Sequence, residues 1–120
     1  MAVLSKEQRQ SLHVLAFMLF RMGQEERAQR IYDGLRALSV PGHPDRMALA
    51  GLAAIAIDRG DGAAALKFLD RVLDDKALPA RRPAFVFMKA QALWLEGRKA
   101  EARAVLDDYL AVAKAEGNDE

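Results

Sequence analysis

At 120 residues, the chain is long enough for one ordinary domain with its own hydrophobic core. Its 18 basic and 17 acidic residues leave a net charge of +1, which argues against a surface dominated by nucleic-acid or anionic-membrane binding. Cysteine is absent, which excludes disulfides and thiol chemistry. The longest uncharged runs are about a dozen residues, too short to span a bilayer. Because the N-terminus also lacks the basic-then-apolar order of a signal peptide, we expect a cytoplasmic protein.

The first predicted helix pair lies near the N-terminus. Ser5 followed three residues later by Gln8 is a capping-box pattern, so a helix is expected to begin there. The run from Leu12 to Phe20 is apolar except for His13, which predicts a helix with neighbours on more than one side. Gly23 ends this run, and a one-sided amphipathic helix follows. The apolar face of that second helix consists of Ala28, Ile31, Tyr32, Leu35 and Leu38.

A connector with two prolines separates the first pair from the second. The segment from Val40 to Pro44 cannot continue a helix, and Pro44 suits the first turn of the next one. The run from Met47 to Ile57 then contains no polar side chain. It ends before Gly60, and Asp61 is a good N-cap for a fourth helix. The apolar face of that helix consists of Ala65, Leu69, Val72 and Leu73.

The third pair follows a second proline-containing connector, Leu78 to Pro83. The run from Ala84 to Leu95 is apolar apart from Lys89 and Gln91, and Gly97 ends it. No segment alternates with period two over any length, so the sequence predicts an all-α chain. The apolar side of the sixth helix consists of Ala102, Val105, Leu106, Tyr109 and Leu110.

A fixed spacing organises the three pairs. A glycine that ends an apolar run is followed five positions later by an alanine, and successive glycines are 37 residues apart. An equal period in this range is typical of stacked repeats. We therefore expect one domain, 1–120, with repeats at approximately 6–40, 44–77 and 81–115. The spacing is carried by Gly23 and Ala28, Gly60 and Ala65, and Gly97 and Ala102.

The repeats resemble the tetratricopeptide repeat, which implies three divergent helix-turn-helix units stacked into a short right-handed superhelix. The residues that carry the likeness are Leu12, Leu15, Ala16, Gly23, Ala28 and Tyr32; Leu49, Leu52, Ala53, Gly60, Ala65 and Leu69; and Val86, Ala90, Leu93, Gly97, Ala102 and Leu106. The period of 37 departs from the usual 34 of such repeats. Further departures are Leu35, Val72 and Tyr109 at the last small position, and Lys89 in place of leucine.

A narrower resemblance is to the small tetratricopeptide chaperones of bacterial type III secretion systems, with the YscY-type chaperone nearest in outline. The stretches that carry it are 5–10, 89–93, 100–103 and 108–110. Members of that family bind a small secreted partner, the YscX-type protein, and help to assemble the export apparatus. The resemblance implies that function for this chain.

A partner-binding groove is expected where the first helix of each repeat, helix A, lines the concave face. Aromatic residues are favoured at interface hot spots, and an amphipathic helix is the natural ligand for an apolar trough. Two alternatives remain: aromatics at helical spacing are often core residues, and a second copy of the chain can fill the trough as a homodimer or as a scaffold in another pathway. The expected groove residues are His13, Phe17, Phe20, Met47, Ala50, Ala54, Ile57, Phe87, Gln91 and Trp94.

Residues for catalysis are sparse in this sequence. There are two histidines, three serines and no threonine, and Ser11 and His13 are two positions apart on one helix and do not face each other. Two isolated histidines give no metal-site spacing, and no glycine-rich phosphate loop is present. We therefore expect no enzyme activity, no metal and no cofactor, and no nucleic-acid partner or membrane insertion.

Overall fold

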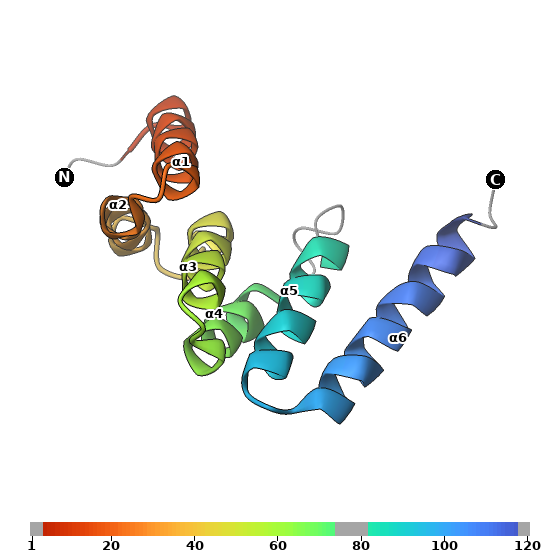
Figure 1. Cartoon of the computed structure of the whole chain (residues 1–120). Helices are drawn as coiled ribbons and strands as arrows, with labels where there is room; N and C mark the ends of the chain where they lie inside the picture. The colour runs from red at the N-terminus through yellow and green to blue at the C-terminus, as the bar shows by residue number, and fades with distance from the viewer. Residues whose placement is uncertain (1–3, 74–81, 118–120) are drawn as a thin grey trace.

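A computed structural model describes residues 4–73 and 82–117, which form six helices joined in sequence (Figure 1). The helices are α1 (Lys6–Arg21), α2 (Glu25–Ala37), α3 (Arg46–Asp58), α4 (Gly62–Leu73), α5 (Arg82–Leu95) and α6 (Lys99–Gly117). Apart from an isolated bridge between Val40 and His43, the described residues contain no β-structure. The prediction of an all-α chain of three helix pairs is confirmed.

Side chains cap the helices that the sequence predicted to begin with a cap. At α1 the Gln8 N–H donates to Ser5 Oγ at 3.1 Å and the Ser5 N–H donates to Gln8 Oε1 at 2.8 Å, so the capping box is confirmed. Asp61 accepts the Ala64 N–H at 3.0 Å at the start of α4.

The start of α3 differs from the prediction. Asp45 is its N-cap and accepts the Ala48 N–H at 2.9 Å. Pro44 therefore precedes the helix, and its predicted place in the first turn is wrong. A carboxylate at the N-cap accepts a hydrogen bond from a free N–H of the first turn. Proline has no side-chain acceptor, so it cannot cap the helix in this way.

Glycines end the first helix of each pair in the same way. Gly23, Gly60 and Gly97 have φ values of 81°, 77° and 76°, in the left-handed region that residues with a Cβ avoid. The N–H of the following residue bonds back to a carbonyl of the last helical turn, from residue 24 to residue 19, from 61 to 56 and from 98 to 93. The spacing of 37 residues thus arises because the same helix-ending motif occurs once in each of the three repeats.

The packing of the helices shows how the array curves. Each helix contacts the next one along the chain, and the A helices also contact one another, α1 with α3 and α3 with α5. Within the described residues, the second helices α2, α4 and α6 make no such contacts with each other. Because the A helices approach one another and the second helices diverge, the A helices lie on the inner side of the curve (Figure 1).

Alanines hold the two helices of each pair together. Positions one repeat apart on the A helices are Ala16, Ala53 and Ala90, and on the second helices Ala28, Ala65 and Ala102. All six are buried. Small residues at these points allow the two backbones of a pair to approach closely.

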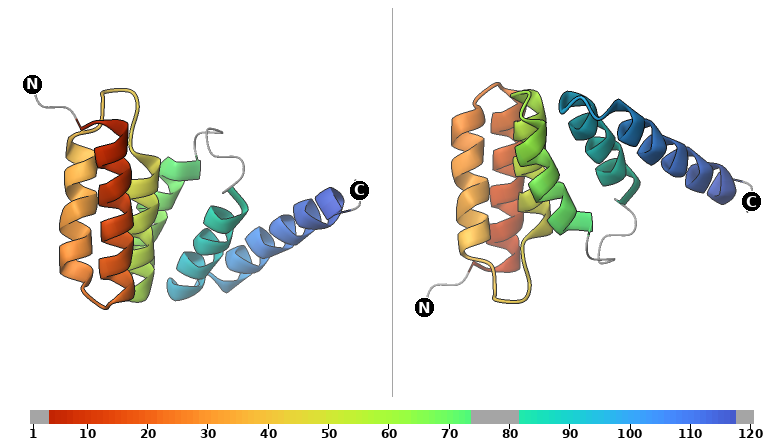
Figure 2. Two further views of the ribbon diagram at one scale, coloured as in Figure 1. Left: turned by 90° about the horizontal axis from the view of Figure 1, so that it is seen from above. Right: turned by 90° about the horizontal axis from the view of Figure 1, so that it is seen from below.

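The last pair is the least enclosed. The helix α6 is longer than α2 and α4, and in Figure 2 it diverges from α5 toward its C-terminus. Val105, Leu106 and Tyr109, on its predicted apolar side, are only half-buried, and Leu110 is exposed. Leu106 and Tyr109 therefore keep apolar surface that the equivalent residues of the first two repeats bury. Those residues are Tyr32 and Leu69, and Leu35 and Val72.

Candidate functional site

An apolar pocket lies in the third repeat, lined by residues of α5, α6 and the end of α3. Its volume is about 340 Å³, and Gln91 is its one polar lining residue. It is lined by Ile57, Phe87, Ala90, Gln91, Trp94, Leu95, Ala102 and Leu106. Four of the predicted groove residues, Ile57 on α3 and Phe87, Gln91 and Trp94 on α5, thus meet in one hollow.

Two aromatic side chains dominate this pocket. Phe87 is 47% exposed and Trp94 is 56% exposed, which is unusual for side chains of this size. Lys99 Nζ lies 5.0 Å from the centre of the Trp94 ring, a cation–π contact that holds the indole at the start of α6. A partner that covers these rings would bury a large apolar area at one point, as hot-spot residues do.

The middle of the inner face belongs largely to the core. Ala50 is buried in the cluster of α3, α4 and α5, and Met47 packs against the same cluster. Ala54 is half-buried. Ala50 is therefore a core residue, whereas Met47 and Ala54 keep part of their surface exposed.

The two predicted aromatic groove residues of α1 have different surroundings. Phe20 is half-buried and packs against the core cluster that α1, α2 and α3 share. Phe17 is 57% exposed. Only Phe17 therefore offers an open aromatic ring in the first repeat.

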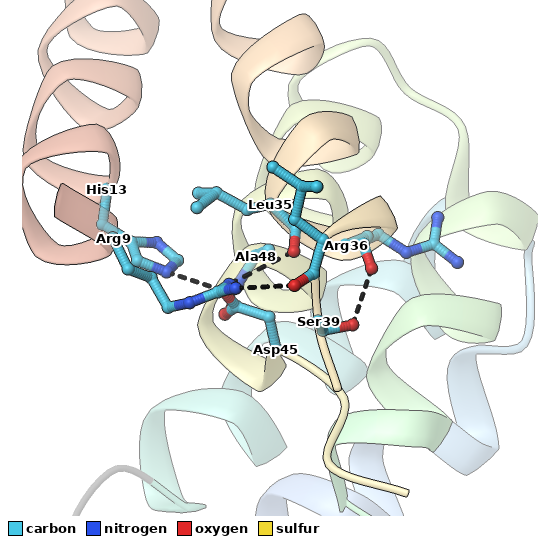
Figure 3. Close-up of polar contacts among 8 residues, drawn as sticks. Arg9, His13, Leu35, Arg36, Ser39, Asp45 and Ala48 are labelled. Carbon is cyan, nitrogen blue, oxygen red and sulfur yellow. Dashed lines mark hydrogen bonds and ion pairs between the residues drawn. The ribbon is translucent and has the colours of Figure 1, made fainter. Parts of the chain in front are cut away.

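His13 takes part in a polar network that joins three helices (Figure 3). Its Nε2 atom lies 3.0 Å from Oδ2 of Asp45, whose side chain is only 6% exposed. Arg9 forms an ion pair with the same carboxylate and donates to the carbonyls of Leu35 at 3.2 Å and Leu38 at 3.1 Å. The network ties α1 to the end of α2 and the start of α3, so His13 is held by structural contacts.

Asp45 is electrostatically well supported in this network. Burial raises the pKa of its carboxyl group, but the hydrogen bonds from His13, the Ala48 N–H and Arg9 outweigh burial and lower the pKa to about 2. The carboxylate is therefore ionised near neutral pH. Its role is to hold helix ends in place.

Several apolar residues outside the predicted groove are also exposed or line the pocket. Ala90, Leu95, Ala102 and Leu106 complete the pocket wall. On α1 and its C-cap, the exposed apolar residues Val14, Leu15, Met18 and Met22 share one face because they are spaced at three and four positions. The sequence signal for this face is the near-continuous apolar run of α1, because a helix that is apolar on most sides needs neighbours on more than one side. The sequence predicts that those neighbours are other helices of the array, and it names no partner for this face of α1.

The described residues give no sign of a metal centre or of a membrane-crossing element. No group of three or more histidine, aspartate or glutamate side chains among them could hold a metal ion. No helix within 4–73 and 82–117 has both the length and the apolar character needed to cross a bilayer.

Comparison with known families identifies the repeat type. Residues 46–71 and 83–108 match the tetratricopeptide repeat model, which places one repeat on α3–α4 and one on α5–α6. The α1–α2 pair continues the same period and packing. No curated protein matches the chain at a significant level. The chain thus contains tetratricopeptide repeats, a scaffold typical of protein–protein interaction and not of catalysis.

Proposed function

We propose that this protein is a chaperone or adaptor that binds an apolar, helical segment of a small secreted partner on the inner side of its A helices. In this proposal it works in the cytoplasm and supports assembly of a type III secretion apparatus, with a YscX-like protein as its partner. The sequence resemblance motivates the secretion role. The exposed Phe87 and Trp94 at the apolar pocket support the binding mode.

The pocket favours one kind of ligand. Its apolar walls with Gln91 as the one polar group suit an aliphatic or aromatic anchor from a partner helix. Covering a surface of this kind prevents the bound segment from aggregating. Release then requires a competitor with higher affinity, which the export machinery would supply.

Co-expression tests this proposal directly. The chain is produced with each small protein encoded beside it and purified by size exclusion, and the thermal midpoint is compared with that of the chain alone. A genuine partner co-elutes and raises the midpoint, since a ligand that binds only the folded state stabilises it. A chain that remains monodisperse and captures none of these proteins contradicts the proposal.

The exposed apolar residues of α1 favour a second candidate function, a scaffold that associates with itself. Phe17 is as open as Trp94, and a homodimer that fills the inner face would cover both rings. Phe17→Glu or Trp94→Ala would then weaken self-association and leave binding to other proteins unchanged. The same variants weaken partner capture if the chaperone proposal is correct.

A further inference from the structure

The joints between consecutive repeats follow one register. In the first joint, three residues of α3 pack on four residues of the α1–α2 pair, and all seven are buried. The residues of α3 are Ala48, Leu52 and Ile55. The residues that receive them are Ala16, Ala28, Tyr32 and Leu35.

The second joint repeats two of these three inserting positions one period later, and the third, equivalent to Leu52, is Lys89, whose Nζ lies 3.6 Å from Asp70. Phe85 and Ala92 of α5 stand 37 positions after Ala48 and Ile55, and both are buried. They belong to one cluster with the receiving residues Ala53, Ala65, Leu69 and Val72, which stand 37 positions after those of the first joint. Two joints in the same register define where a further joint would form.

A further shift of 37 positions leads to a receiving surface on which none of the described residues forms a third joint. We call it the end groove, and it consists of Ala90, Ala102, Leu106 and Tyr109. Leu106 is half-buried and lines the apolar pocket, whereas the equivalent Leu69 is 0% exposed. Tyr109 is likewise half-buried, in contrast to the buried Val72.

At the other end, α1 presents an inserting face that no repeat within 4–73 and 82–117 receives. We call it the α1 edge, and it consists of Val14, Leu15 and Met18 with the C-cap residue Met22. Leu15 and Met18 are equivalent to Leu52 and Ile55, and the exposed Ser11 stands at the position of Ala48. Leu15 is 46% exposed, whereas Leu52, one period later, is 4% exposed. Met18 is 53% exposed, whereas its equivalent Ile55 is 2% exposed.

At one pair of facing positions, the side chains of the α1 edge and the end groove can be compared in size with those of the two internal joints. In the first joint the large Tyr32 faces Gly51, with no room for a Cβ atom between them. The equivalent residues of the second joint, Leu69 and Met88, are both of intermediate size and lie in one cluster. The equivalent residues at the two ends are Leu106 in the end groove and Val14 on the α1 edge. Both are again of intermediate size.

Charge is also compatible at the rim. In the first joint Arg59 donates to Gln29 at 2.8 Å and lies 3.6 Å from Glu25. In the end groove, the positions equivalent to Glu25 and Gln29 are cationic, Lys99 and Arg103. The α1 edge carries the neutral Met22 in place of Arg59, so no pair of like charges forms there.

We propose that copies of this chain associate head to tail, with the α1 edge of one copy packed into the end groove of the next. A second copy is the occupant because both halves of the joint lie on this chain in the register that it uses internally. Such a contact is heterologous, so it produces open rows or rings of copies. It leaves one edge and one groove free at the ends of every open row.

Complementary variants test this joint in the isolated protein. Met18→Glu blocks only the α1 edge, and Leu106→Glu blocks only the end groove. The mass of each is measured by sedimentation across a wide concentration range, alone and in an equimolar mixture. Circular dichroism confirms that each variant is folded, and Leu15→Glu and Tyr109→Glu are second variants of the edge and the groove.

The expected results are specific to a head-to-tail joint. The unmodified chain increases in mass with concentration beyond twice the monomer, and each variant alone is a monomer. The mixture forms a dimer of one copy of each, because the Leu106→Glu chain keeps its edge and the Met18→Glu chain keeps its groove. An unmodified chain that stays monomeric, a variant that still dimerises alone, or a mixture without the dimer overturns the proposal. Met18 lies outside the pocket, so Met18→Glu retains partner capture if the proposed function is correct.

Discussion

The ring of Tyr32 lies against the backbone of Gly51, where α2 meets α3. A Cβ atom at position 51 would be 2.3 Å from Cζ of Tyr32 and 2.6 Å from both Cε atoms. Gly51→Ala is therefore expected to destabilise the protein by roughly 1–3 kcal/mol, although alanine forms helices better than glycine does. Urea unfolding monitored by circular dichroism measures the change.

A second glycine provides the matched control for this prediction. Gly34 lies within α2, and a Cβ atom there would have nothing within 4 Å. Gly34→Ala is expected to stabilise the chain by up to about 1 kcal/mol, because only the helix preference changes. Combining Gly51→Ala with Tyr32→Leu should recover part of the loss, and equal effects at positions 34 and 51 would contradict the close contact.

The lowered pKa of the Asp45 carboxyl group predicts that the folded protein loses stability in acid. Its pKa is about 2 in the folded chain, against an ordinary value of 3.8. The lowered pKa stabilises the folded chain at pH values above the ordinary pKa of 3.8. This stabilisation is lost as the pH falls from about 4 through 2. The loss is roughly 2 kcal/mol at about 1.4 kcal/mol per pKa unit. Urea titrations at a series of pH values measure it, and Asp45→Asn should remove this part of the pH dependence.

Arg9 is expected to contribute more to stability than most surface residues. It donates to the Leu35 and Leu38 carbonyls and pairs with Asp45, so Arg9→Ala leaves a nearly buried carboxylate and two helix-end carbonyls short of a donor. The expected cost is roughly 2–3 kcal/mol. Lysine has no planar fork of donors, so Arg9→Lys should restore only part of it. Full recovery by lysine in thermal unfolding would show that charge alone matters.

Sequence reasoning predicted the helices and their ends well because those signals are local. The Ser5 capping box, the Asp61 cap and the three helix-ending glycines each depend on a few neighbouring residues. Which side chains of the inner face are held by contacts within the chain depends, by contrast, on residues that are distant in the sequence. The contact between His13 and Asp45 spans 32 positions and joins two different repeats, and periodicity alone carries no information about such a pairing.

The exposed edges show a second limit of sequence reasoning. An apolar residue on a helix predicts burial, but the burial of Leu52 and Ile55 depends on a preceding repeat. The equivalent Leu15 and Met18 have the same character but contact no other repeat on this face among the described residues, so they are exposed. Position in the array, rather than residue type, decides which apolar positions become core.

The aromatic residues of the pocket should dominate partner binding if the proposed function is correct. Trp94→Ala is expected to weaken binding by roughly 2 kcal/mol, which is about 30-fold in the dissociation constant. Leu110→Ala is the matched control, because Leu110 is 59% exposed on the same helix pair but does not line the pocket. Calorimetric titration of the purified partner compares the two variants. Equal effects would place the binding surface elsewhere.

The three helix-ending glycines allow one backbone conformation to be tested three times in one protein. Gly23, Gly60 and Gly97 share a positive φ, and a Cβ atom at each would have nothing within 4 Å. The cost of alanine at these positions is therefore conformational, at roughly 1–2 kcal/mol each, with no contribution from a clash. Asparagine tolerates this region better and should cost less at every site. Because the sites are one repeat apart, the three losses should be similar and should add in the triple variant. Urea unfolding of the three alanine variants measures this, and a loss at only one site would show that the three turns are not energetically equivalent.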